Sequence, residues 1–227
     1  MLTPMLRMQV APDVGALGLR GRYFVIQGLK NLGSDPEFDR YRKGSIEEIL
    51  KAWPSSNIED DPALGGFRAL HRAAGVKDAA LVASPYALMR SLTQKGMLPN
   101  INLLVDIYNL VSLQTRLAIG AHDVQRISGG VSLRRASGKE RFIPLGSSMA
   151  RKVGCEEYCY FDEEEVLCRL EVRQAEKTRI TIETSDAYYI VQGNGRTSRE
   201  EIESAADRLV SLTRRFCGGK YHHIADV

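Results

Sequence analysis

The sequence predicts an α+β fold, because segments with helical periodicity come first, strand patterns follow, and one further helix comes near the end. Residues 38–52 and 101–116 place apolar side chains at the three-to-four-residue spacing of helices. From residue 131 onward, short runs rich in β-branched and aromatic residues indicate strands. Strands and helices do not alternate regularly, so we do not expect the parallel sheet of an α/β protein.

Start signals support the helices in the first half of the chain. The pairs Asp61-Pro62 and Ser84-Pro85 are each typical of a residue before a helix followed by proline in the first turn. Residues 101–116 are apolar almost all round, which indicates a helix in the centre of the molecule.

Two hairpins are expected among the strands. Ser137-Gly138 separates the first two strands of the second half, and Ser185-Asp186 separates the last two. The expected strands are residues 23–26, 131–135, 141–145, 158–161, 166–170, 179–184 and 187–191.

The two ends of the chain carry opposite signals. Residues 1 to about 20 contain prolines and glycines that break any pattern, so we expect weak structure there. Ser198 and Glu201 form a capping box, which predicts a helix that ends at Gly218.

Composition bounds the function without assigning it. The chain has 227 residues and a net charge of +3, which permits contact with nucleic acid but does not require it. No apolar stretch approaches the roughly 20 residues that span a bilayer, and Met1 to Val14 lack a signal-peptide pattern. We therefore expect a cytoplasmic protein with no membrane partner. The cysteines and histidines lack the paired spacing of zinc ligands, so we expect no metal and no cofactor.

Two polar residues interrupt the apolar segment 101–116. Asp106 and Asn109 stand one helical turn apart and therefore face the same side. Polar groups in such surroundings need partners or a ligand. In one interpretation Asn109 lines a pocket and binds a ligand, while Asp106 holds the adjoining turn. In the other, both residues satisfy backbone N–H groups near Gly120 and Ala121.

A segment of small residues follows, and we interpret it as a turn that ends in His122 and Asp123. His122 is either a catalytic residue or a hydrogen-bonded core histidine. The sequence alone leaves both interpretations open.

Residues 98–135 resemble the editing domain, or B3/4 domain, of the phenylalanyl-tRNA synthetase beta subunit. That domain carries Asp-Val-Thr-Asn-Tyr-Val and then His-Ala-Phe-Asp, and Asp106, Asn109 and Asp123 match its first Asp, its Asn and its last Asp without a gap. The resemblance implies mixed β-sheets in a layered β/β/α arrangement with flanking helices. It also implies a B3/4-like domain at residues 84–227. The resemblance is weak before Ser84, and we expect the strand and helices of residues 1–83 to pack on the same core.

The resemblance implies a function as well: hydrolysis of the ester that joins a wrong amino acid to the 3′ end of a tRNA. The expected action is in trans, because the sequence shows no aminoacylation domain. Asn109 and His122 are the candidate catalytic residues, and Gly120 and Ala121 would supply backbone N–H donors. Asp106 and Asp123 would be structural.

One departure from the family pattern bears on this function. Gly120 stands where the family has the first histidine of His-Ala-Phe-Asp. Either the chemistry has moved to His122, or it relies on the tRNA ribose hydroxyl and a bound water, or hydrolysis is lost. In the last case the protein is a module that binds tRNA or an amino acid. A third class of function is a small-molecule protein whose arginines bind a carboxylate.

Further candidates follow the strand at 166–170. Arg169 and Arg173 would clamp a carboxylate or phosphate, or Arg169 and Glu171 would form a surface salt bridge. Glu176 and Thr178 are the nearest counterparts of a glutamate and a threonine that follow a glycine-rich segment in the family. The candidate substrate-binding residues are Tyr108, Gly120, Ala121, Arg169, Arg173, Glu176 and Thr178.

Basic residues cluster at 134–141, 151–152 and 214–220. They would contact phosphates, or they belong to a solvated surface of mixed charge.

Overall fold

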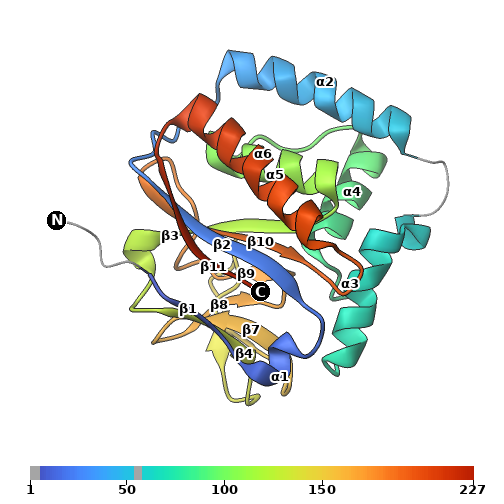
Figure 1. Cartoon of the computed structure of the whole chain (residues 1–227), viewed down its shortest axis with the longest axis vertical. Coiled ribbons are helices and arrows are strands. Elements are labelled where there is room, and N and C mark those ends of the chain that lie inside the picture. The colour runs from blue at the N-terminus through green and yellow to red at the C-terminus, as the bar shows by residue number, and fades with distance from the viewer. Residues whose placement is uncertain (1–5, 54–57) are drawn as a thin grey trace.

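The computed structural model describes residues 6–53 and 58–227, so the first five residues of the expected weak start lie outside it. A five-stranded and a four-stranded β-sheet are stacked on each other, and helices cover the outer face of the four-stranded sheet (Figure 1). The expected layered β/β/α arrangement is confirmed.

The four-stranded sheet is antiparallel throughout and has the order β11-β2-β10-β3. One of its faces packs against helices α5 and α6, through residues such as Phe24, Tyr189 and Leu209. The elements are β2 (Arg20–Gln27), β3 (Ala118–Asp123), β10 (Asp186–Gly193), β11 (Lys220–Asp226), α5 (Leu103–Thr115) and α6 (Arg199–Cys217).

The five-stranded sheet has the order β1-β4-β7-β8-β9, and β1 pairs with β4 in parallel. A short two-stranded ladder, β5 with β6, is joined to it by a bridge between Pro144 and Ala175. The strands are β1 (Met8–Val10), β4 (Val131–Arg135), β5 (Arg141–Phe142), β6 (Arg151–Lys152), β7 (Tyr158–Phe161), β8 (Val166–Arg169) and β9 (Arg173–Gln174).

Helices α2 and α4 pack against α5. The expected cap of α3 is present. The Asp61 side chain accepts hydrogen bonds from the backbone N–H groups of Ala63 and Leu64. None of the helices in the described part of the chain combines the length and apolar character needed to cross a membrane. The remaining helices are α1 (Pro12–Gly15), α2 (Pro36–Ala52), η1 (Ile58–Asp60), α3 (Pro62–Ala73), α4 (Ser84–Lys95) and η2 (Val124–Arg126).

Both expected hairpins are wrong. β4 pairs with β1 and β7 rather than with residues 141–145, and β10 pairs with β2 and β3. Residues 179–184 form no strand, and two of their carbonyl groups accept hydrogen bonds from side chains. Asn102 donates to the Ile180 oxygen, and Asn31 donates to the Thr181 oxygen. Turn residues favour a local reversal, but a strand pairs with whichever strand continues its buried face.

The segment expected as a turn, Ala118–Asp123, is strand β3. Its residues alternate, as in any strand: Ile119 and Ala121 face the helices, while Ala118 faces the other sheet. The segments 8–10 and 220–226 are also strands, although no strand was expected in either. These short strands are held by pairing with distant segments, which local sequence patterns do not report.

Candidate functional site

A pocket of about 380 Å³ opens between the two sheets, at the edge formed by β3 and β9. Helices α4 and α5 form the opposite wall. Five of the residues singled out from the sequence line this pocket together: Tyr108, Asn109, Gly120, His122 and Arg173. The floor is provided by the inner faces of β8 and β10 and by the turn between β8 and β9.

Neither Asp106 nor Asp123 is among the lining residues; both carboxylates bind neighbouring groups. Asp106 accepts a hydrogen bond of 3.1 Å from the Ile101 N–H, and the guanidinium of Arg42 lies 3.6 Å away. Burial raises the pKa of Asp106, and the charge of Arg42 opposes that rise. The interpretation in which Asp106 bonds the backbone near Gly120 is therefore wrong.

The Asp123 carboxylate holds the segment that follows β3. It accepts hydrogen bonds from the Gln125 N–H at 3.0 Å and from the Thr184 hydroxyl at 2.8 Å. Asp123 thereby ties the end of β3 to the loop before β10.

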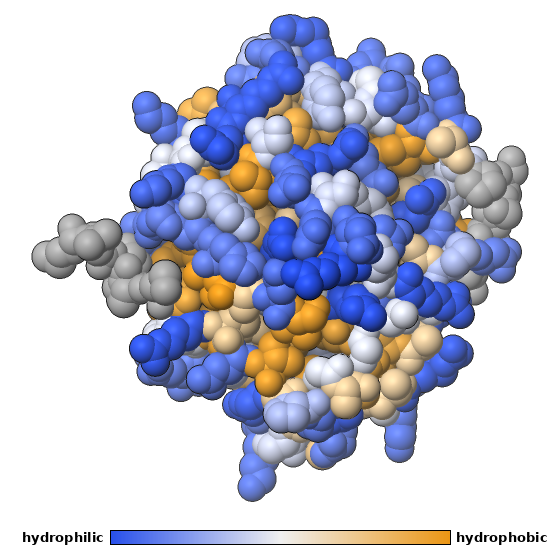
Figure 2. Space-filling model, in the orientation of Figure 1, coloured by the Kyte–Doolittle hydropathy of each residue, from blue (hydrophilic) through white to orange (hydrophobic). Residues whose placement is uncertain are grey.

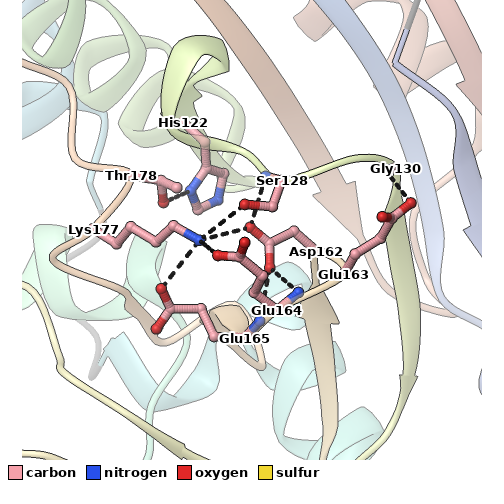
Figure 3. A network of polar contacts seen from close by, with 9 residues as sticks. All are labelled: His122, Ser128, Gly130, Asp162, Glu163, Glu164, Glu165, Lys177 and Thr178. Atoms are coloured by element: carbon pink, nitrogen blue, oxygen red, sulfur yellow. Dashed lines mark hydrogen bonds and ion pairs between the residues drawn. The ribbon is translucent and has the colours of Figure 1, made fainter.

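His122 is buried and neutral. Its Nδ1 lies 2.7 Å from the Thr178 hydroxyl, and its Nε2 has no partner among the described residues. Burial lowers the pKa of His122 to about 4, and the negative charge of Asp162 opposes this only in part. Figure 3 shows the ring with Thr178, and a network in which Lys177 binds Asp162, Glu164 and Glu165. The imidazole is therefore uncharged at pH 7, and the same burial disfavours its protonated form.

Two expected ligand-binding residues lie outside the pocket lining. Arg169 donates two hydrogen bonds to Glu157, at 2.6 and 2.7 Å, and does not pair with Glu171 as the alternative interpretation expected. The Glu176 carboxylate accepts from the Gly146 N–H at 2.9 Å and pairs with Arg179. Both side chains hold neighbouring loops.

Neither Ala121 nor Thr178 lines the pocket, but each binds a residue that does. The Ala121 side chain faces the helices, and its carbonyl oxygen accepts a hydrogen bond from Gln174. Thr178 is fully buried and orients the ring of His122.

The structure adds a buried acid that the sequence interpretation placed on the surface. Glu171 lines the pocket and receives hydrogen bonds from His71, Tyr158 and Gln192. Burial alone would lower the pKa of His71, but the charge and hydrogen bond of Glu171 outweigh it and raise that pKa. His71 stands 100 residues before its partner, so no local pattern announces the pair.

Backbone strain lies next to this acid. Leu170 adopts a left-handed conformation with φ of 53°, which is uncommon for a residue other than glycine. The turn directs Glu171 inward, whereas continued strand alternation had placed it with Arg169 on the outside. The glycine-rich character of the resembled segment was the one available signal for an unusual backbone here.

Gln174 is a second pocket residue that the sequence did not reveal. It lies on β9, and its Nε2 donates to the Ala121 oxygen at 3.1 Å. The contact joins the edge strands of the two sheets. Its two residues, Gln174 and Ala121, are 53 positions apart in the chain.

Comparison with known proteins identifies relatives of this chain. Residues 73–218 match the model of the B3/4 domain. The phenylalanine–tRNA ligase beta subunit of Nocardia farcinica (strain IFM 10152) is 31% identical over 145 residues, which cover 62% of this chain and 16% of that protein. The chain thus spans about a sixth of the length of this curated relative.

The fold is also similar to a solved structure. The N-terminal fragment of the phenylalanyl-tRNA synthetase beta subunit from Pyrococcus horikoshii matches with a TM-score of 0.53 and 15% identity, over 98% of this chain and 53% of that fragment. The resemblance predicted from residues 98–135 is confirmed, and since the domain model matches more than half of the residues, the chain belongs to the B3/4 domain family.

Proposed function

We propose that this protein is a trans-editing hydrolase, which removes wrong amino acids from the 3′ end of charged tRNA. The observation that carries this proposal is the pocket between the sheets. It gathers Asn109, Gly120 and His122 in the part of the chain that matches the B3/4 domain. Its volume of about 380 Å³ lies within the range of small-molecule sites.

The chemistry needs neither a metal nor a nucleophilic side chain. An aminoacyl ester is already activated, so a positioned water and hydrogen-bond donors to the carbonyl oxygen suffice. The water oxygen adds to the carbonyl carbon, the bond to the ribose oxygen breaks, and that oxygen takes up a proton. Asn109 is the proposed donor, and His122 is proposed to accept a hydrogen bond from the attacking water at its unpartnered Nε2.

A cationic surface beside the pocket supports an RNA partner. We define the basic ribbon as Lys139, Arg141, Arg151 and Lys152, all of them exposed on or next to β5 and β6. Arg141 lies directly opposite Lys152 in this ladder, and neither forms an ion pair within the described residues. Like charges in opposite positions repel each other, and RNA phosphates would relieve that repulsion.

The ribbon leads into the pocket. Leu145 follows β5, lines the pocket, and donates its N–H to the Gln174 carbonyl oxygen at 2.8 Å. An RNA end held on the ribbon would therefore lie next to the pocket mouth. Elsewhere, charged side chains separate small apolar patches, as the face in Figure 2 shows.

A deacylation assay tests the proposal. The purified protein is incubated with a panel of correctly and wrongly charged tRNAs, and loss of labelled amino acid is followed. Rapid loss from one mischarged species is the expected result. Intact esters across the panel, at protein concentrations that saturate tRNA binding, would reject the hydrolase.

Gly120 favours one alternative, a module that binds charged tRNA or an amino acid without cleaving the ester. No side chain at this position reaches the pocket, and the amide of Gln174 lies against the glycine. Binding of tRNA with full retention of the amino acid would support the module and exclude the hydrolase.

A further inference from the structure

Gln174 and Gly120 both line the pocket and lie directly against each other, on the edge strands of two different sheets. The Gln174 Nε2 donates to the carbonyl oxygen of Ala121, the next residue after Gly120. A Cβ atom at position 120 would lie 2.6 Å from this nitrogen, which is an overlap. The Gln174 amide therefore occupies the space into which a side chain at position 120 would extend.

The amide is anchored but not saturated. The Gln174 backbone is held by its pairing with Cys168 and by the Leu145 N–H. A carboxamide has two N–H donors and an oxygen with two lone pairs. Within the described residues, Gln174 uses only one N–H of its side chain, in the bond to Ala121. The second N–H and the oxygen are left for a ligand in the pocket that Gln174 lines.

We propose that Gln174 binds the carbonyl oxygen of the aminoacyl ester, and that position 120 is a glycine because this amide needs the space. The proposal rests on the proposed function, since it takes an aminoacyl ester as the ligand. In the resembled pattern a histidine stands at the position of Gly120. Here the polar group at this place is the Gln174 amide, which comes from β9 of the other sheet.

The role of the amide follows from the charge that develops on its partner. The carbonyl oxygen becomes more negative as water adds to the carbonyl carbon, so a fixed N–H donor binds it more strongly at that stage. When the bond to the ribose oxygen breaks and that oxygen is protonated, Gln174 is left unchanged. Asn109 approaches the same pocket from α5, and the ester would lie between the two amides.

The first experiment measures binding without hydrolysis. The probes are 3′-aminoacylamino-3′-deoxyadenosines with alanyl, phenylalanyl and tyrosyl groups, whose amide carbonyl replaces that of the ester. Gln174→Met keeps the length of the side chain and removes its hydrogen bonds. We expect the tightest probe to bind Gln174→Met about 10-fold more weakly than wild type.

Gln125→Met is the matched control, because Gln125 is exposed on η2 and does not line the pocket. It should bind like wild type. Binding by Gln174→Met within twofold of wild type would overturn the inference. In the deacylation assay Gln174→Met should reduce turnover about 100-fold, as loss of an oxyanion donor does.

A second experiment tests why position 120 is a glycine. Gly120→Ala places a Cβ against the Gln174 amide and should displace it, with a loss of probe binding similar to that of Gln174→Met. In a Gln174→Ala background the same change should have no further effect, because the amide is gone. Equal losses in both backgrounds would show that Gly120 serves another purpose. Thermal unfolding of each variant checks that it is folded.

The two levels of the proposal fail in different ways. If the wild-type protein binds no probe and cleaves no ester, both the proposed function and this inference are wrong. If the wild-type protein binds and cleaves, and the Gln174→Met variant does so equally well, only the inference is wrong.

Discussion

The two faces of the four-stranded sheet bury different kinds of side chain, although the same strands form both faces. On one face Phe24 and Tyr189 pack against α5 and α6 in an apolar core. On the other face their neighbours Tyr23 and Tyr188 pack between the two sheets. There a hydrogen-bonded chain of polar side chains is buried: Tyr23, Tyr160, Gln192, Glu171, Tyr158 and His71.

The comparison shows where function is to be sought. Apolar packing against helices stabilises the fold without further purpose. Buried polar groups contribute little stability unless every one is satisfied, so their presence indicates a site. The polar face also opens into the pocket. The following predictions test this division, from the largest expected effect to the smallest.

Removal of one side chain that packs against each face should separate stability from binding. Leu209→Ala, on α6 against the helix-covered face, should lower the free energy of unfolding by about 2–5 kcal/mol and leave ligand binding intact. Glu171→Ala strands three buried donors, so it should lower that free energy by about 3 kcal/mol and also impair binding. Urea unfolding and probe binding measure both. Equal loss of binding in the two variants would remove the distinction between the faces.

His122 should make the protein less stable in acid. Its folded pKa is about 4, below its ordinary value of about 6.5. The unfolded chain therefore binds a proton that the folded chain excludes, and stability falls as pH drops from about 6.5 to 4. The expected loss from this group is roughly 3 kcal/mol. His122→Asn should flatten the pH dependence of urea unfolding in this range, and an unchanged slope would contradict the buried neutral imidazole.

His71 should show the opposite sign. The pKa of His71 is raised by Glu171 in the folded state, so its contribution is fully present below the unfolded pKa of about 6.5. The contribution is lost as pH rises through the folded pKa. His71→Gln should therefore differ most from wild type at mildly acidic pH and approach it at high pH. Urea unfolding at a series of pH values tests this order.

Asn109→Ala should affect turnover rather than stability. Asn109 is half-buried and lines the pocket from α5. Loss of a donor to the reacting carbonyl should reduce deacylation about 10- to 100-fold. Gln114→Ala on the same helix is the control, because Gln114 lies outside the pocket lining. Unchanged turnover would exclude Asn109 from the mechanism.

The basic ribbon should trade RNA binding against stability. Arg141→Glu places an acid opposite Lys152, which should raise the free energy of unfolding by about 0.2–1 kcal/mol. The same change should weaken tRNA binding and reduce its salt dependence. Arg214→Glu on α6 makes the same change of net charge away from the pocket and should leave tRNA binding unaffected. Equal weakening by both variants would mean that net charge, not the ribbon, attracts RNA.

Local signals by themselves determined much of the framework. The Asp61 cap, the capping box of Ser198 with Glu201, and the apolar segment expected at 101–116 all correspond to observed helices. The strands expected at 131–135, 158–161 and 166–170 correspond to β4, β7 and β8. Caps and periodicity act between residues a few positions apart, so the sequence carries them directly. The match of Asp106, Asn109 and Asp123 to a known pattern pointed to the B3/4 family.

Only the tertiary structure decided how these elements make a site. In the folded chain, residues 118–123 form an edge strand, His71 lies against Glu171, and the Gln174 amide lies against Gly120. Each of these contacts joins segments that are distant in the chain, and none changes the local periodicity of either partner. Polar side chains that look exposed in a strand pattern become pocket residues only when a second sheet covers them, which is a property of packing and not of sequence spacing.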